Sequence, residues 1–410
     1  MTEELRLNEY KERIKAAIRS NSDRGFVNYS GCIRLSMEMM SIVEQAEAGA
    51  QRDPVLAFDI VIMVINEVMK LISHTDDSSG SLGEAIRDSM RVIDEFCQSI
   101  DESNRKYFFD TIIKTAKRKA MKEWPDFGYG LLQSVVHLIH EKKQVRKVSE
   151  VFEALGTLYS GSKYPEEYVI TYKITNRLEG PEAADQYLMT HIKVPELRCI
   201  AVEKALEEKN YASAEELCIT AKSIEEQGFN RNLKWDHYLE RIYSETSNQT
   251  KLIEVVYGIL AQGDTSYYPK LQQLYDAEGT WEQQKEPLLQ KLSVTLSDHY
   301  YASVLHQADE FEKLLELLSR DNSLIMSYGQ QVAKRYPDEM YPIYEAYILD
   351  QAQHATDRRK YRETCRFLKK YYDAGAKQES VQLIDRLSAM YPRRSAMLDE
   401  LSKLKGKLEK

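Results

Sequence analysis

Apolar residues recur along most of this chain at the spacing of one face of an α-helix. In residues 3–20, for example, Leu7, Ile14 and Ile18 fall on one side and charged residues occupy most of the remainder. Short breaks that contain Gly, Pro, Asn or Asp separate one such segment from the next. The pattern therefore predicts an all-α protein built from many amphipathic helices.

The repetition is clearest in residues 319–407, where each predicted helix has one apolar stripe that needs a neighbour to cover it. From about residue 146 the predicted helices are short and come in pairs, with a period of roughly 30–36 residues that is typical of tetratricopeptide-like repeats. We therefore expect an α-solenoid of tetratricopeptide-like helix pairs over residues 146–410. An N-terminal helical bundle is expected over residues 1–145.

One segment of the predicted bundle, residues 55–72, is apolar almost all round. It contains Asp59, Glu67 and Lys70, which a membrane-spanning helix rarely tolerates, so a buried core helix is expected and no membrane span. Asp53 and Pro54 precede it as a predicted N-cap and a first-turn proline.

The loop that follows resembles a calcium-binding loop in part. If Gly80 takes the position of the loop glycine, Asp77 and Ser79 fall at ligand positions. Thr75 and Ile86 then stand where such a loop requires Asp and Glu. The favoured interpretation of residues 76–83 is a tight structural loop that caps the next helix, with calcium binding as the alternative.

Two histidines, His137 and His140, are three residues apart in a helix predicted over 129–142, with Glu141 beside them. Such a pair can supply two metal ligands, but no further ligand stands at a suitable spacing. Structural histidines are the favoured interpretation, and a metal-dependent hydrolase is the alternative. No cofactor is expected.

Charge is distributed unevenly along the chain. The net charge is −9, yet residues 358–410 hold 15 Lys and Arg against 7 Asp and Glu, so this end carries +8 and the remainder −17. Such asymmetry can mark a docking surface for an acidic partner. The favoured interpretation of the asymmetry itself is a pair of solvated faces, or a basic end attracted to the acidic remainder.

The five cysteines are scattered and form no Cys-x-x-Cys pair, which favours a reducing compartment. The first residues are charged and amphipathic, unlike a signal peptide. A cytoplasmic protein is therefore expected.

The 27 tyrosines and the basic end supply the candidate binding residues. Tyrosines can anchor a peptide or stack on bases, although packing between repeat helices is the commoner role. The candidate partner-binding residues are Tyr341, Tyr344, Tyr361, Arg362, Lys369, Lys370, Tyr371, Arg393 and Arg394.

Three stretches carry a family resemblance: KRYPDEMYPIYE (334–345), KYRETCRFLKKYYDAG (360–375) and MYPRRSAMLDEL (390–401). They resemble the helical region that follows the zinc-chelating module of bacterial SWIM zinc-finger proteins, and the loop at 76–83 is similar to one near the start of that region. The family's zinc module needs Cys-x-Cys followed by Cys-x-His, which this chain lacks. The resemblance therefore implies a partner-binding role without zinc.

These features predict a non-enzymatic interaction scaffold that binds a protein or peptide on its helical-repeat surface. A homodimer is a further expectation, because solenoid ends expose apolar faces unless they are capped. The alternative is nucleic-acid association through the basic end, with Tyr361, Tyr371 and Tyr372 as stacking residues. Its candidate phosphate contacts are Arg358, Arg359, Lys360, Arg362, Lys369, Lys370, Arg393 and Arg394.

Overall fold

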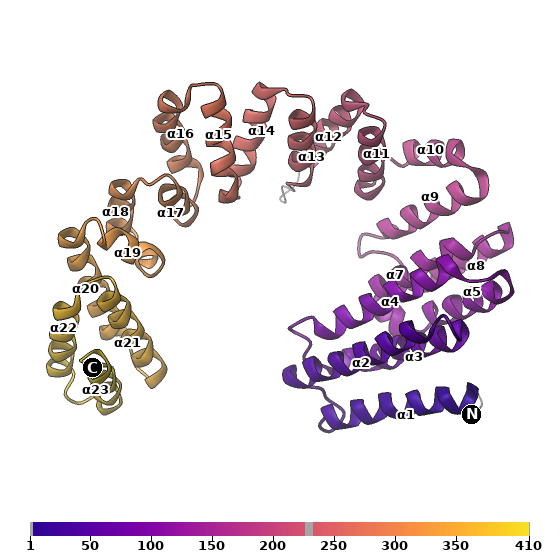
Figure 1. Ribbon diagram of the computed structural model, residues 1–410, viewed down its shortest axis with the longest axis horizontal. Helices are drawn as coiled ribbons and strands as arrows, with labels where there is room; N and C mark the ends of the chain where they lie inside the picture. Colours follow the sequence, from indigo (N-terminus) through magenta and orange to yellow (C-terminus); the bar gives the residue numbers. More distant parts are fainter. Residues whose placement is uncertain (1–2, 226–232, 410) are drawn as a thin grey trace. The chain divides into compact units, whose positions relative to one another are not determined.

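The computed structural model describes residues 3–225 and 233–409, and within these ranges the chain forms 23 α-helices, four short 3₁₀-helices and no β-strand (Figure 1). Contacts divide the chain into two compact units, Met1–Leu217 and Cys218–Lys410, which we call unit 1 and unit 2. The predicted fold class, an all-α helical-repeat architecture with an N-terminal bundle, is confirmed.

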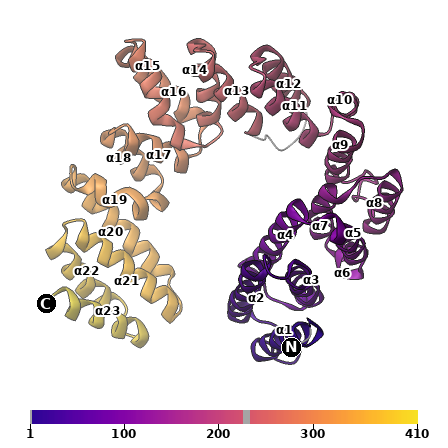
Figure 2. The ribbon, with the colours of Figure 1, turned by 45° about the vertical axis from the view of Figure 1, so that its right-hand side comes forward.

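Unit 1 contains the N-terminal helices, in which α2, α3 and α4 lie side by side (Figures 1 and 2). The helices are α1 (Glu3–Asn21), α2 (Tyr29–Gly49), α3 (Pro54–Leu71), η1 (Ile72–His74), α4 (Ser81–Ser99), α5 (Glu102–Ala116), α6 (Lys119–Glu123), α7 (Pro125–Val135), η2 (Val136–Leu138), α8 (Lys142–Leu155), α9 (Pro165–Glu179), α10 (Pro181–Thr190), α11 (Pro195–Glu207) and the first part of α12 (Tyr211–Glu225).

Helix α3 is the centre of this bundle, as its apolar sequence predicts. Its residues from Leu56 to Met69 are mostly buried, and it packs against α1, α2, α4 and α5. The Asp53 side chain accepts a hydrogen bond from Leu56 N (3.0 Å), and Pro54 begins the helix. The predicted cap is therefore confirmed.

The main apolar core of unit 1 extends beyond residue 145. It includes Ile170 and Ile174 of α9, and the compact unit ends only at Leu217. The division between units thus lies further along the chain than the expected boundary of 145/146. The helices become shorter and paired before this core ends, so helix length does not mark the boundary.

Unit 2 is a row of helices, and from α13 onward each contacts the next in sequence. Many also contact the helix after that, as stacked helix pairs do. Its helices after α12 are α13 (Lys234–Glu245), α14 (Gln249–Ala261), η3 (Thr265–Tyr267), α15 (Tyr268–Ala277), α16 (Trp281–Thr295), α17 (Asp298–Gln307), α18 (Phe311–Arg320), η4 (Asn322–Leu324), α19 (Ile325–Ala333), α20 (Pro337–His354), α21 (Arg358–Asp373), α22 (Lys377–Met390) and α23 (Ser395–Leu408).

Several helix pairs share one turn geometry. The second residue after the first helix has a left-handed backbone at Lys209 (φ 57°), Ser247 (φ 55°), Gly279 (φ 69°) and Asp309 (φ 61°). The next backbone N–H then reaches back five residues to a carbonyl of the first helix, as in a Schellman motif. These bonds are Asn210 N to Ala205 O (2.7 Å), Asn248 N to Tyr243 O (3.0 Å), Thr280 N to Tyr275 O (2.9 Å) and Glu310 N to Leu305 O (2.9 Å).

The loop before α4 is a helix cap, as favoured from the sequence. Asp77 Oδ1 accepts hydrogen bonds from Leu82 N (3.0 Å) and Ser81 Oγ (3.2 Å), and Asp77 Oδ2 accepts one from Gly83 N (3.0 Å). Both oxygens of this carboxylate are therefore used by the first turn of α4.

We expect Asp77→Ala to lower the free energy of unfolding by about 1–2 kcal/mol, because it leaves the first N–H groups of α4 without their acceptor. Urea unfolding measures the change. Asp76→Ala is the matched control, since it removes the neighbouring exposed carboxylate and leaves the cap intact. Equal stability of the two variants, or a calcium-dependent rise in the wild-type melting temperature, would contradict the capping role.

Candidate functional site

The C-terminal helices α19–α23 hold the residues that the sequence marks for partner binding. Helix α21 begins at Arg358 because Asp357 caps it, its side chain accepting a hydrogen bond from Lys360 N (3.0 Å). One face of α21 is buried, at Tyr361, Thr364, Phe367, Leu368 and Tyr371. The opposite face is exposed and mostly basic.

Three of the predicted anchors lie inside the protein, which corrects their assignment. Tyr344 is 0% exposed, Tyr371 1% and Tyr361 7%. The rings of Tyr344 and Tyr371 stack at 5.3 Å between centroids, and the edge of Tyr341 contacts Tyr371 at 5.6 Å. Burial raises the pKa of Tyr344 and of Tyr371. Their helical spacing reflects packing between helices, the commoner role of such tyrosines.

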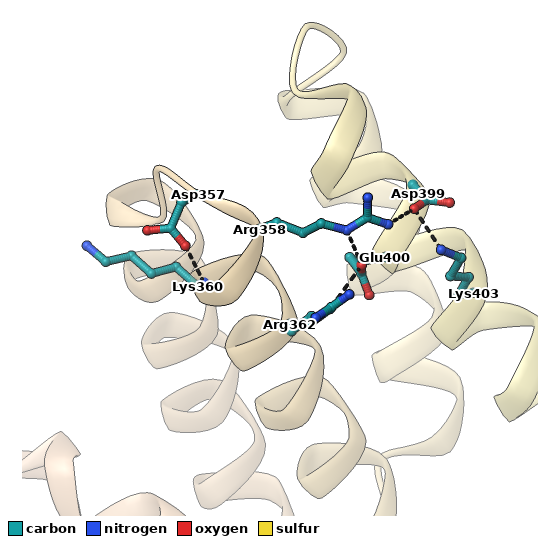
Figure 3. A network of polar contacts seen from close by, with 7 residues as sticks. All are labelled: Asp357, Arg358, Lys360, Arg362, Asp399, Glu400 and Lys403. Atoms are coloured by element: carbon teal, nitrogen blue, oxygen red, sulfur yellow. Dashed lines mark hydrogen bonds and ion pairs between the residues drawn. The ribbon is translucent and has the colours of Figure 1, made fainter. Parts of the chain in front are cut away.

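Two of the candidate cations join α21 to α23 (Figure 3). The guanidinium groups of Arg358 and Arg362 converge on Glu400, with Nε–Oε1 distances of 2.7 and 3.2 Å. Arg358 also contacts Asp399, which lies 2.7 Å from Lys403 Nζ. The hydrogen bond from Arg358 lowers the pKa of Glu400, and that from Lys403 lowers the pKa of Asp399.

Two further cations donate to backbone carbonyls. Lys370 Nζ donates to Met326 O (2.6 Å) in α19. Arg394 donates to Ala352 O (2.8 Å) and Gln353 O (3.3 Å), which belong to the last turn of α20. These last carbonyls have no partner within the helix, so Arg394 closes the end of α20.

The remaining cations face solvent. Arg359, Arg366 and Arg393 are exposed and form no side-chain hydrogen bond or ion pair within residues 3–225 and 233–409. Lys369 is half exposed and pairs with Asp373 of its own helix (2.5 Å). We call Arg359, Arg362, Arg366, Lys369 and Lys370 the α21 basic face, which Glu363 interrupts. Arg366 was not singled out from the sequence, although its helical spacing from Arg359 and Arg362 places it there.

The histidine pair does not form a metal site. Helix α7 ends at Val135, so His137 lies in η2 and His140 beyond it, and the expected shared helix face is wrong. His137 Nε2 lies 3.3 Å from Asp94, whereas His140 Nε2 lies 3.1 Å from Arg105 Nη1. In the described ranges no three His, Cys, Asp or Glu residues are grouped to hold a metal ion. None of the described helices is long and apolar enough to cross a bilayer.

Comparison with known proteins leaves the family open. No family model and no curated protein sequence matches the chain. A solved structure described as a "circular tandem repeat protein with novel repeat topology and enhanced subunit contact surfaces" aligns with 98% of this chain and 94% of its own, at 14% identity and a TM-score of 0.21. The SWIM-like resemblance stays a prediction.

We expect Gly329→Ala to destabilise the protein by about 1–3 kcal/mol, because a Cβ at this position of α19 would lie 2.7 Å from the hydroxyl of the fully buried Tyr344. Thermal unfolding measures the loss. The matched control is Gly258→Ala in α14, where a Cβ meets nothing within 4 Å. That control should keep or raise stability, since alanine favours helix over glycine. Two equal melting temperatures would argue against tight packing of α19 on Tyr344.

The ion pairs that Glu400 of α23 forms with Arg358 and Arg362 of α21 should stabilise the fold to an extent that depends on pH. A carboxyl group whose pKa is lower in the folded than in the unfolded protein stabilises the fold. This contribution is complete at a pH above the pKa in the unfolded chain, about 4.3 for Glu, and it is lost as the pH falls through the lower pKa of the folded state. We therefore expect Glu400→Gln to be less stable than wild type at neutral pH, with the difference shrinking below about pH 4.

Urea unfolding at several pH values measures this difference. Glu363→Gln is the matched control, because Glu363 is an exposed carboxylate of α21 with no ion pair in the described part of the chain. If the free energy of unfolding differed between wild type and Glu400→Gln by the same amount at every pH, the assigned role of the Glu400 ion pairs would be contradicted.

Proposed function

We propose that this protein is a non-enzymatic helical-repeat scaffold that binds an acidic segment of a partner protein on the α21 basic face. The observation that carries the proposal is the arrangement of α21. One side of the helix is fixed in the core of unit 2, and the other presents Arg359 and Arg366 to solvent without carboxylate partners in the described residues. A row of cations on a rigid helix suits recognition of carboxylates.

Fixed placement of these cations supports the proposal further. Arg362 is held by Glu400, which also holds Arg358, so part of the basic face has a defined position before a partner arrives. A preorganised side chain loses less conformational entropy on binding than a mobile one. The SWIM-like motifs fit this arrangement, because Arg394, Asp399 and Glu400 in their last stretch hold α20, α21 and α23 together.

The environment of the thiols is compatible with a non-enzymatic role in a reducing compartment. Cys32, Cys97, Cys199 and Cys365 are thiols and not halves of disulfides. Burial raises the pKa of Cys365 to about 12 and also raises the pKa of Cys32 and Cys97. Such thiols are poor nucleophiles at neutral pH. We place the scaffold in the cytoplasm as part of the proposal, and a homodimer stays a prediction.

Nucleic-acid binding has weaker support. Two of its proposed stacking residues, Tyr361 and Tyr371, are buried, and the Tyr372 hydroxyl donates to Leu408 O (3.2 Å). Arg358, a proposed phosphate contact outside the α21 basic face, is paired with Glu400 and Asp399. Nucleic-acid binding is therefore treated as one possible outcome of the experiment below.

We expect reversal of two exposed charges, Arg359→Glu with Arg366→Glu, to reduce capture of the partner at least about tenfold, which corresponds to about 1.4 kcal/mol. The measurement is a crosslinking pull-down with quantitative mass spectrometry, with and without nuclease. The matched control is Lys106→Glu with Lys114→Glu, which reverses two exposed cations of α5 in unit 1.

A partner that survives nuclease, is lost with the α21 variant and is retained with the α5 variant would support the proposal. Capture that is equal for the two variants would contradict it. Loss of all captured proteins on nuclease treatment would instead assign the basic face to nucleic acid.

A further inference from the structure

Unit 1 contains an open cavity of about 660 Å³ between α4, α7 with η2, and α9. We call it the α4–α9 cavity. Its volume falls within the range of small-molecule sites, roughly 300–1,000 Å³. Met90 and Val136 supply apolar lining, and most of the remaining lining side chains are polar or charged.

The charged lining is predominantly positive. Arg87 and Arg91 come from α4, Lys173 and Arg177 from α9, and among the described lining residues Asp94 is the single carboxylate. Unit 1 as a whole is acidic, with 29 Lys and Arg against 36 Asp and Glu over residues 1–217. The lining of the cavity is therefore positively charged, although unit 1 as a whole is negatively charged.

Three of these cations have no carboxylate partner within the described residues. Lys173 Nζ donates to the neutral amide oxygen of Gln133 (2.8 Å). Arg177 Nε donates a hydrogen bond to Ile139 O (2.9 Å), which leaves its two Nη groups to contact a ligand. Arg87 forms no ion pair there. Arg91, in contrast, pairs with Glu95 (2.5 Å), and Asp94 lies beside His137.

A buried hydroxyl beside the cavity also has no partner among the described residues. Ser134 of α7 lines the cavity and is 1% exposed, yet its Oγ has no hydrogen-bond partner in the described part of the protein. A buried hydroxyl without a partner costs free energy. Like charges gathered in a partly enclosed space also repel one another, and an anion between them removes that repulsion.

We propose that the α4–α9 cavity binds a small organic phosphate, with Arg87, Lys173 and Arg177 around the phosphate and Met90 and Val136 against its carbon skeleton. A guanidinium group can donate two parallel hydrogen bonds to two oxygens of one phosphate, and the lysine ammonium group adds a further positive charge. The apolar residues beside the cations favour a ligand with an organic part over a free ion. This site is separate from the α21 basic face and does not depend on the proposed function.

Titration calorimetry with pyrophosphate and with ATP tests the proposal on the full chain at physiological ionic strength. We expect saturable binding with one site per chain. Arg87→Gln with Lys173→Gln should weaken it at least about tenfold, since two charge-assisted contacts are lost. Because both side chains are exposed, the variant should fold, which its circular dichroism and melting temperature check.

Two control variants make the result specific. Lys106→Gln with Lys114→Gln removes the same charge from an exposed face of α5 and should leave binding unchanged. Arg359→Glu with Arg366→Glu should also leave it unchanged, so failure of this proposal is distinguishable from failure of the partner-binding proposal.

The absence of saturable binding, or an equal loss with the α5 control, would overturn the proposal. A phosphoserine peptide that binds more than about tenfold tighter than ATP would also overturn it, and would assign the cavity to a phosphorylated protein segment. Tighter binding of ATP than of pyrophosphate, lost in the cavity variant alone, is the result that supports an organic phosphate.

Discussion

Most of the described helices have one apolar stripe, and no helix can cover that stripe alone. In unit 2 the apolar stripe of a helix is covered by the next helix in sequence and often by the one after it. This arrangement requires the chain to reverse direction within a few residues, again and again. The left-handed residues at Ser247 and Asp309 meet that requirement, although a left-handed backbone costs a non-glycine residue about 1–2 kcal/mol. The hydrogen bond that closes each turn offsets part of this cost.

Stacking of this kind also determines what the polar side chains do. Long cations reach from one helix to acceptors on a neighbour, as Arg358 does to Glu400 and Arg386 to Glu345. Helix α21 begins with three cations, which its own dipole disfavours. Asp357 at its N-cap and Glu400 on α23 bring negative charge to that end. Glu345 and Glu400 thus have a structural role, since each holds a cation of a neighbouring helix.

Local signals in the sequence were sufficient for most helices. Helix α9, for example, spans Pro165–Glu179, and the sequence marks both ends because Pro165 stands in its first turn and Gly180 follows its last residue. The helix expected over 129–142 was wrong, because Pro125 starts α7 earlier and the chain leaves the helix after Val135. Periodicity also predicted the apolar stripes that contain Tyr344 of α20 and Tyr371 of α21, but it could not distinguish a stripe that lines a groove from one buried under another helix. Only the packing of α19 and α20 decides that question.

The two candidate sites show why charge along the sequence is an incomplete guide to binding. The last 53 residues carry a net charge of +8, yet Arg358, Arg362 and Arg386 are matched by carboxylates across helices. The α4–α9 cavity lies in an acidic unit, and its cations come from helices nearly ninety residues apart, so no window of the sequence reveals it. What matters in both places is a cation held near others without a carboxylate partner, and that property exists only after folding.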